Sequence, residues 1–252
     1  MTKLYHHNAT STVTGTLPST SQSALGAPTS PVDALTVNRT MNTTIGTAQA
    51  SLTHTQAATA GANNTCYVTR FVSTQINQSG IAANTWTYNF AAKLSVTTPV
   101  DDFPTNDTAP KFIPICCYVW RPSTGTKVGN ILDGNSATGV YTDLGNGGTN
   151  TTSESVEHGT FAGAAVASAA ANDVIILEAW VDAWFSTATS NVQSYFYDGT
   201  TVNTTAGAVV SNHASFLETP ENITLVGGGG GSPITMTNVS TLDFSDHLIT
   251  KV

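Results

Sequence analysis

The sequence predicts an all-β protein: an antiparallel β-sandwich, jelly-roll-like, with a long extended N-terminal arm and a short C-terminal tail. Three observations predict this class. Residues 86–95 alternate apolar and polar side chains over ten positions, further short apolar runs are separated by turn-rich links, and strand–helix–strand alternation is missing. The expected domains are the arm over 1–62, the sandwich over 63–226, and a Gly-rich hinge with the tail over 227–252.

The expected arm is rich in Thr, Ser, Ala, Gly and Pro, and residues 1–60 contain no Phe, Trp or Tyr after Tyr5. Such a segment buries too little apolar surface to offset its conformational entropy. We therefore expect neighbouring subunits to order it, and the alternative is a flexible N-terminal tail. His6 and His7 are expected to be solvated residues of this arm, with a loose metal site at a symmetry axis as the alternative.

Two strands are expected early in the sandwich. In residues 86–95, Trp86, Tyr88 and Phe90 fall on one face with Ala92 and Leu94, while polar residues dominate the other, which indicates a half-buried strand. Residues 66–72 form a second candidate. Residues 111–121 are apolar on both faces and predict a central strand, with Pro114 near its start or at a bulge.

The rest of the sandwich is less regular. Residues 122–134 predict a turn, a short strand and another turn, and the Gly- and Asn-rich residues 135–159 predict a long loop. Residues 160–186 are ambiguous, because their Ala-rich first part favours a helix. The β-branched run after the Asn172–Asp173 turn favours a strand over residues 173–185. Later short strands are expected at 193–197, 207–210, 214–218 and 222–226.

Charge excludes two classes of partner. Lys and Arg total 8 against 16 Asp and Glu, for a formal net charge of −8, and the basic residues form no cluster. A phosphate backbone requires clustered cations, so we expect no nucleic-acid binding and no anionic membrane surface as partner. The longest weakly polar stretch, residues 161–185, is interrupted by Asn172, Asp173, Glu178 and Asp182, which excludes a membrane span.

The cysteines predict folding under reducing conditions. Their count is three, an odd number that cannot form a closed disulfide set. Cys116 and Cys117 are adjacent, so on a strand they point to opposite faces and make a poor shared metal site. We expect buried free thiols and no metal. The chain also opens without an apolar export region, which predicts assembly in a cytoplasm.

Glu178 and Asp182 are the acids that most resemble a catalytic pair, because they flank Trp180 and precede Trp184. Four residues along a strand span ~13 Å. Paired glycosidase carboxylates lie ~5–9.5 Å apart. The alternative is a strand whose second face is partly covered by a neighbour, and we favour it. We expect no catalytic residues, no cofactor and no enzymatic activity.

Aromatic side chains are the candidates for contact with a partner or ligand, because large amphipathic rings favour interfaces and sugar faces. The candidates are Trp120, Trp180, Trp184, Tyr195 and Tyr197. Trp120, Trp180 and Trp184 are expected to anchor either the core or an interface. Trp180 and Trp184 are also the residues expected to bind a surface glycan, if the protein is a carbohydrate-binding module.

Four segments resemble small β-sandwich structural proteins of tailed bacteriophages, such as capsid decoration (cement) proteins and tail-associated subunits. They are VWRPSTGTKVGNILDG (119–134), NDVIILEAWVDAW (172–184), YFYDGT (195–200) and SFLETPENITL (215–225). The resemblance covers roughly residues 65–225 and includes the plan of a Thr-rich arm ahead of a sandwich. It implies a non-enzymatic virion subunit, often trimeric, whose arm runs over or between its neighbours.

The expected function is therefore structural. The chain is expected to be a capsid decoration or cement protein located in the virion, assembled in the host cytoplasm with other virion proteins and homo-oligomeric, a trimer being favoured. The alternative is a tail- or fibre-associated adhesion or carbohydrate-binding sandwich.

Overall fold

Strands are the regular elements of the chain, as the sequence predicts. The computed structural model describes residues 1–23, 31–56, 63–94, 100–101, 116–133, 153–185 and 191–226. The strands in these ranges are β1 (Thr2–Thr10), β2 (Arg39–Asn42), β3 (Ala50–Gln56), β4 (Asn63–Ser73), β5 (Asn84–Leu94), β6 (Val100–Asp101), β7 (Cys116–Arg121), β8 (Thr126–Leu132), β9 (Ser155–Gly163), β10 (Val174–Phe185), β11 (Asn191–Tyr197) and β12 (Phe216–Thr219).

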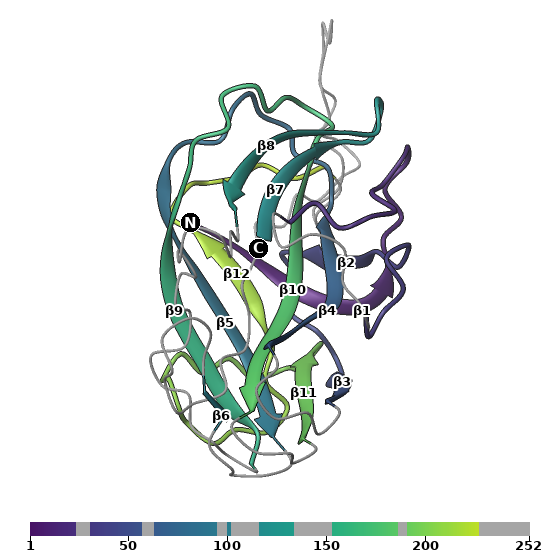
Figure 1. Cartoon of the computed structure of the whole chain (residues 1–252). Helices are drawn as coiled ribbons and strands as arrows, with labels where there is room; N and C mark the ends of the chain where they lie inside the picture. The colour runs from purple at the N-terminus through teal and green to yellow at the C-terminus, as the bar shows by residue number, and fades with distance from the viewer. Residues whose placement is uncertain are drawn as a thin grey trace, which may run out of the picture.

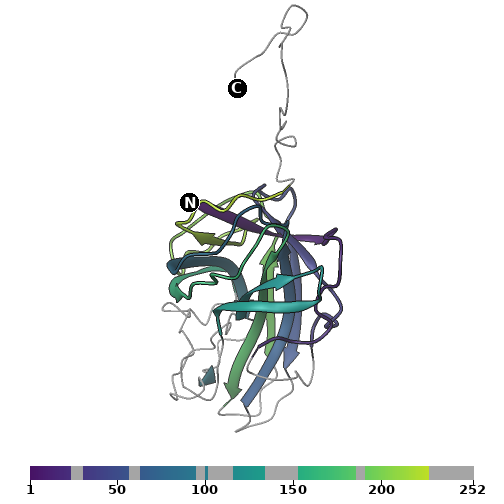
Figure 2. The same cartoon turned by 90° about the horizontal axis from the view of Figure 1, so that it is seen from above.

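The strands form one hydrogen-bonded path that folds back on itself. Its order is β3-β11-β5-β12-β1-β2-β4-β10-β7-β8, with β9 on β5 and β6 on β10. All pairings are antiparallel except the one between β2 and β4. Figures 1 and 2 show the result: β5 and β9 lie in one layer, and β4 and β10 lie in the other. The fold is thus sandwich-like, and the all-β prediction is confirmed.

The main core lies between these two layers. Trp86 and Phe90 from β5 and Phe71 from β4 belong to one buried cluster, together with Leu177 from β10 and Tyr195 from β11. Ring contacts join the layers, because Tyr195 lies 5.4 Å from Phe90 and 6.0 Å from Phe71 between ring centroids. Such pairs stabilise beyond the area they bury.

The alternation predicted for residues 86–95 is confirmed over residues 86–92 of β5, although both faces of the strand carry buried residues. The Leu94 side chain and Ser95 lie outside the described residues. Trp86, Tyr88, Phe90 and Ala92 face the main core, as predicted. On the opposite face Asn89 and Ala91 are also fully buried. The segment 199–215 covers this face, since Ala91 N donates to Ser215 Oγ (3.2 Å).

Residues 174–185 form strand β10, the alternative that the sequence favoured over a helix. β10 pairs with β4 on one side and β7 on the other. Its residues alternate between two buried surfaces, because Ile175 and Leu177 face the main core while Val174 and Ile176 belong to a second cluster on the outer face. Burial on both faces explains why the apolar run is nearly continuous.

The N-terminal residues differ most from the prediction, because β1, β2 and β3 are part of the sheet rather than an extended arm. β1 lies between β12 and β2, with Thr2 opposite Thr219 and His6 opposite Met41. The side chains of Thr2, Leu4 and His6 are buried in alternation with half-buried neighbours. Short-range alternation in TKLYHHNAT therefore outweighs the polar composition of the whole segment, on which the arm was predicted.

The predicted loop over residues 135–159 also differs at its end, since β9 begins at Ser155 and pairs along β5. Residues 207–210 and 222–226 form isolated bridges through Val209 and Leu225 instead of the expected strands. The predicted start of the central strand at 111–115, including Pro114, residues 135–152 and the hinge and tail over 227–252 lie outside the described residues.

Two glycines of β9 make room for aromatic rings of β5. A Cβ added at Gly163 would come within 2.3 Å of Trp86 Cδ1, and one at Gly159 within 2.1 Å of the Tyr88 hydroxyl. The rings are fully buried and packed on other core residues, so they cannot move away cheaply. Glycine at these positions therefore fixes how closely β5 and β9 approach.

We expect Gly163→Val to lower the free energy of unfolding by about 1–3 kcal/mol, because the branched side chain overpacks against Trp86. The measurement is urea unfolding followed by tryptophan fluorescence. Thr160→Val on the same strand is the matched control, since Thr160 is exposed. Equal stability of the two variants would contradict this role for Gly163.

Candidate functional site

The most unusual site in the molecule is an ion pair on the outer face of the β4–β10–β7 layer. Arg70 of β4 and Glu178 of β10 lie directly opposite each other in the strand register. Arg70 Nη2 lies 3.0 Å from Glu178 Oε1, and both side chains are fully buried. Charged residues are almost never fully buried unless they are paired, so this pair must be held by further partners.

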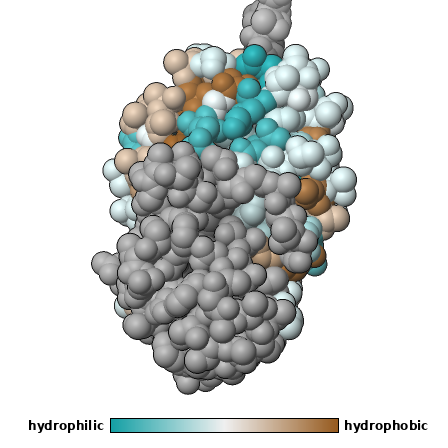
Figure 3. All heavy atoms as spheres, in the orientation of Figure 1, coloured by the Kyte–Doolittle hydropathy of each residue, from teal (hydrophilic) through white to brown (hydrophobic). Residues whose placement is uncertain are grey.

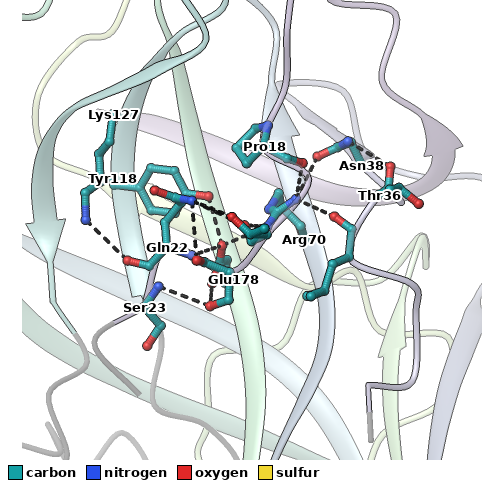
Figure 4. A network of polar contacts seen from close by, with 12 residues as sticks. Pro18, Gln22, Ser23, Thr36, Asn38, Arg70, Tyr118, Lys127 and Glu178 are labelled. Carbon is teal, nitrogen blue, oxygen red and sulfur yellow. Dashed lines mark hydrogen bonds and ion pairs between the residues drawn. The ribbon is translucent and has the colours of Figure 1, made fainter. Parts of the chain in front are cut away.

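Those partners come from the segment that follows β1, which we call the N-terminal strap (residues 11–23). The strap crosses the outer face, as Figure 4 shows around Pro18, Gln22 and Ser23. It packs Val13 and Leu17 on the outer-face cluster, whose members are Val72, Cys116, Tyr118, Trp120, Val174 and Ile176. Trp120 Nε1 donates to Thr16 O (2.7 Å), which fixes the strap at its middle.

Main-chain oxygens of two segments accept from the Arg70 guanidinium. Nη1 donates to Pro18 O (2.6 Å) and Leu35 O (2.9 Å), and Nη2 donates to Thr20 O (2.7 Å). A guanidinium offers five donors in a fixed planar fork, so it can bind several carbonyls at once. Arg70 thereby ties the strap and residues 31–38 to the same point on β4.

The Glu178 carboxylate is equally occupied. Oε1 accepts from Gln22 N (3.0 Å) and from the Tyr118 hydroxyl (2.9 Å), and Oε2 accepts from Ser21 Oγ (2.9 Å). Burial and the neighbouring Glu178 carboxylate raise the pKa of Tyr118 well above its ordinary value, which keeps the phenol protonated as a donor. The carboxylate therefore serves to hold the strap and does not face a cleft.

The interpretation of Glu178 as a residue on a covered strand face is thus confirmed, and the cover is the chain's own strap. Sequence reasoning missed Arg70 as its partner. The signal was present in CYVTRFV, because an Arg inside an apolar strand segment requires a buried acid, and Glu178 is the acid within the apolar run of β10. The side chain of Asp182 lies outside the described part of the chain.

Four of the five aromatic candidates are core residues rather than surface residues. Trp180, Tyr195 and Tyr197 are at most 2% exposed, and Trp120 is 6% exposed. Tyr195 and Tyr197 belong to the main core, Trp120 to the outer-face cluster, and Trp180 packs edge-on against Tyr67. Large rings far exceed other side chains in apolar area, so packing them inside is favoured. The side chain of Trp184 lies outside the described residues.

A second polar anchor lies on the outer face of β5. Asn203 N donates to His213 Nδ1 (3.4 Å), which leaves the proton on Nε2 to be donated to Asn89 Oδ1. The Asn89 amide in turn donates to Asn203 O (2.9 Å) and to His158 Nδ1 (3.1 Å). This network fixes the neutral form of His213 and holds the segment 199–215 over the sheet.

His6 is also buried, contrary to the expected solvated arm. Its ring stacks on Phe71 with centroids 4.4 Å apart, and its Nδ1 shares a hydrogen bond of 2.7 Å with the Tyr195 hydroxyl. His7 contacts Asp198 (2.9 Å between Nδ1 and Oδ1). Both residues stabilise the position of β1 within the sheet.

The three cysteines are buried thiols, as expected. Cys117 faces the main core and Cys116 the outer-face cluster, so the opposite orientation of the adjacent pair is confirmed. Burial raises the pKa of Cys66 to about 11 and that of Cys116 and Cys117 as well. Protonated buried thiols are unreactive.

Other sites offer little for chemistry. A shallow hollow of about 400 Å³ is lined by Thr2, Lys3, Tyr5, Glu218 and their neighbours. In the part of the chain that the structure describes, no three His, Cys, Asp or Glu side chains are grouped so as to hold a metal ion. No helix among the described residues has the length and apolar character needed to cross a membrane.

Comparison with known proteins adds no assignment: no protein-family model matches the sequence, and the search of curated proteins finds no match.

We expect Arg70→Met to lower the free energy of unfolding by about 3–5 kcal/mol, because it leaves the Glu178 carboxylate buried without its cation. The double variant Arg70→Met/Glu178→Leu is expected to recover much of this loss, since it removes both charges. Urea unfolding of the two variants and the native protein measures the effect. A double variant less stable than Arg70→Met would contradict it.

We expect acid to destabilise the protein through His6 and His213. Burial lowers the pKa of His6 to about 3 and that of His213 to about 4. Below the ordinary histidine pKa of about 6.5, both histidines are protonated in the unfolded chain but stay neutral in the folded chain. Their stabilising contribution is therefore complete above pH 6.5 and is lost as the pH falls towards 3.

The check is the free energy of unfolding measured between pH 7 and pH 4 for the native protein and for His6→Phe. The variant removes one group that titrates differently in the two states, so its slope should be smaller by up to about 1.4 kcal/mol per pH unit. Parallel curves for the two proteins would show that His6 does not carry this effect.

Proposed function

We propose that this chain is a non-enzymatic structural subunit of a bacteriophage virion, suited above all to a capsid decoration or cement role. It works as a homo-oligomer in contact with another virion protein, such as the major capsid protein. The observation that carries the proposal is that the side chains best suited to catalysis or ligand binding are buried. Glu178, Arg70, Trp120 and Trp180 all make internal contacts.

The remaining surface supports a role in protein contact. Only 10% of the residues are charged, and Thr, Ser and Asn are frequent. Figure 3 shows small hydrophobic patches separated by pale and hydrophilic residues on the visible described surface. A surface of short uncharged side chains brings backbone groups close to a partner and costs little desolvation, which favours contact with another β-protein.

The interior supports a role that requires rigidity. Both layers are closed on their outer faces by the chain itself, one by the N-terminal strap and the other by the segment 199–215. Each cover is tied down by a buried polar network, Arg70–Glu178 in the first case and Asn89–His213 in the second. A subunit that reinforces a shell has to transmit force without rearranging, and this construction is suited to that task.

The cysteines support assembly in a reducing compartment followed by release into an oxidising environment. Three buried cysteine thiols are compatible with a cytoplasm, where disulfides are rare. Because burial raises their pKa and removes them from solvent, they are protected from oxidation after release. A particle protein experiences both environments in turn.

We expect the protein to co-sediment with DNA-filled particles in a density gradient of a phage lysate, at a fixed molar ratio to the major capsid protein. Quantitative mass spectrometry of the gradient fractions measures the ratio, and immunogold labelling places the protein on the head. Label on the tail would instead support the tail-associated adhesion role. A protein found only in the soluble fraction would overturn the proposal of a virion subunit.

A further inference from the structure

The two ends of the sheet path differ in how they are protected. At one end, β8 carries Lys127 and its pairing with β7 is interrupted by two register irregularities. Charged residues and bulges at an edge prevent another strand from adding to it. The outer side of β9 is also closed, because Val156 bonds to Ala208 and Gly207 through their backbones and Ala164 N donates to Ile131 O.

β3, at the other end of the path, has none of these protections. Its sequence ASLTHTQ contains no Lys, Arg, Asp, Glu, Pro or Gly. It pairs with β11 over all seven residues without a register irregularity. In the described part of the chain, residues 50–56 form no backbone–backbone hydrogen bond with a segment other than β11. Every second backbone amide and carbonyl of β3 is thus directed away from β11, and these groups have no backbone partner among the described residues.

The chemistry of β3 fits a second copy of itself. Ser51, Thr53 and Thr55 are exposed and lie on one face of the strand. An antiparallel pair centred on Thr53 would place Thr53 opposite its counterpart and Ser51 opposite Thr55. Thr–Thr and Thr–Ser pairs stabilise neighbouring strands. The chain has a net charge of −8, so two copies repel each other least where neither carries charge.

We infer that β3 is a homotypic interface, through which two copies join edge to edge about a two-fold axis at Thr53. The sheet then continues from β11 through β3 into β3 and β11 of the second copy. This contact is isologous, so it closes at a dimer. It differs from the trimer that the phage resemblance implies, and it rests on the sheet edge alone, not on the virion role.

Charge placed at Thr53 tests the axis directly. In Thr53→Lys two like charges meet across the two-fold axis, so we expect the dimer to dissociate, with light scattering giving the 26.1 kDa mass of one chain. Mixing Thr53→Lys with Thr53→Glu should restore the dimer, because opposite charges then meet. Thr160→Lys, an exposed residue of β9 with the same change of charge, is the matched control and should remain dimeric.

A cross-link gives an independent measurement on the full-length protein. Residues opposite each other in an antiparallel pair have Cα atoms about 4.5–5.5 Å apart, within reach of a disulfide. Thr53→Cys should therefore form a covalent dimer under mild oxidation, whereas Thr160→Cys should not. The native cysteines are buried and do not compete.

A native protein that is monomeric at tens of micromolar, or a trimer, would overturn the inference. An oligomer that Thr53→Lys leaves intact would overturn it as well, since the contact would then lie elsewhere. A monomer that binds a different protein through β3 would show that the edge serves strand addition from another chain. Each of these outcomes leaves the test of particle association unaffected.

Discussion

The buried ion pair between Arg70 and Glu178 determines the path of the N-terminal strap and of residues 31–38. Two charges with no exposure to water are stable only if most of their donors and acceptors have partners, because each unsatisfied one costs free energy. Arg70 Nε lacks a partner among the described residues, so the bonds made by the two terminal nitrogens hold the site. The carbonyls of Pro18, Thr20 and Leu35 supply those bonds. The path of the strap and of residues 31–38 is therefore fixed by where these oxygens must lie.

An apolar pair of similar volume could stabilise the same face as well, so stability alone does not explain the choice. We interpret the ion pair as the contact that fixes where the strap lies along the outer face. Thr- and Ser-rich segments such as the strap can slide over an apolar surface with little change in contact. A planar guanidinium donates only to carbonyls in defined positions, and the Glu178 carboxylate likewise accepts only from donors in defined positions, here Gln22 N and Ser21 Oγ. The Asn89–His213 network does this for the segment 199–215.

The sequence was sufficient to predict the strands whose periodicity is strong. β5 and β10 follow from alternation and from β-branched residues, and the opposite orientation of Cys116 and Cys117 follows from strand geometry. Prediction was wrong where composition was averaged over a long segment, because the alternation of Thr2, Leu4 and His6 in β1 is hidden by the Thr- and Ser-rich composition of residues 1–60. The burial of the aromatic candidates depends on which strands become neighbours, and single-sequence patterns do not specify that order. An Arg within the apolar segment 66–72 indicates that a buried acid must exist, but only the pairing of β4 with β10 places Glu178 opposite it.

The pairing of β1 with β12 has a consequence for the order of events during synthesis. Thr2 lies opposite Thr219, so β1, the first strand to be synthesised, can pair with β12 only after more than two hundred further residues have been made. Until then β1 can pair only with β2, and the sheet cannot close around its core. Closing so long a loop is slow and leaves strand edges exposed meanwhile. The low apolar content of residues 1–60, which contain no Phe, Trp or Tyr after Tyr5, limits how strongly these exposed edges associate before β12 is made.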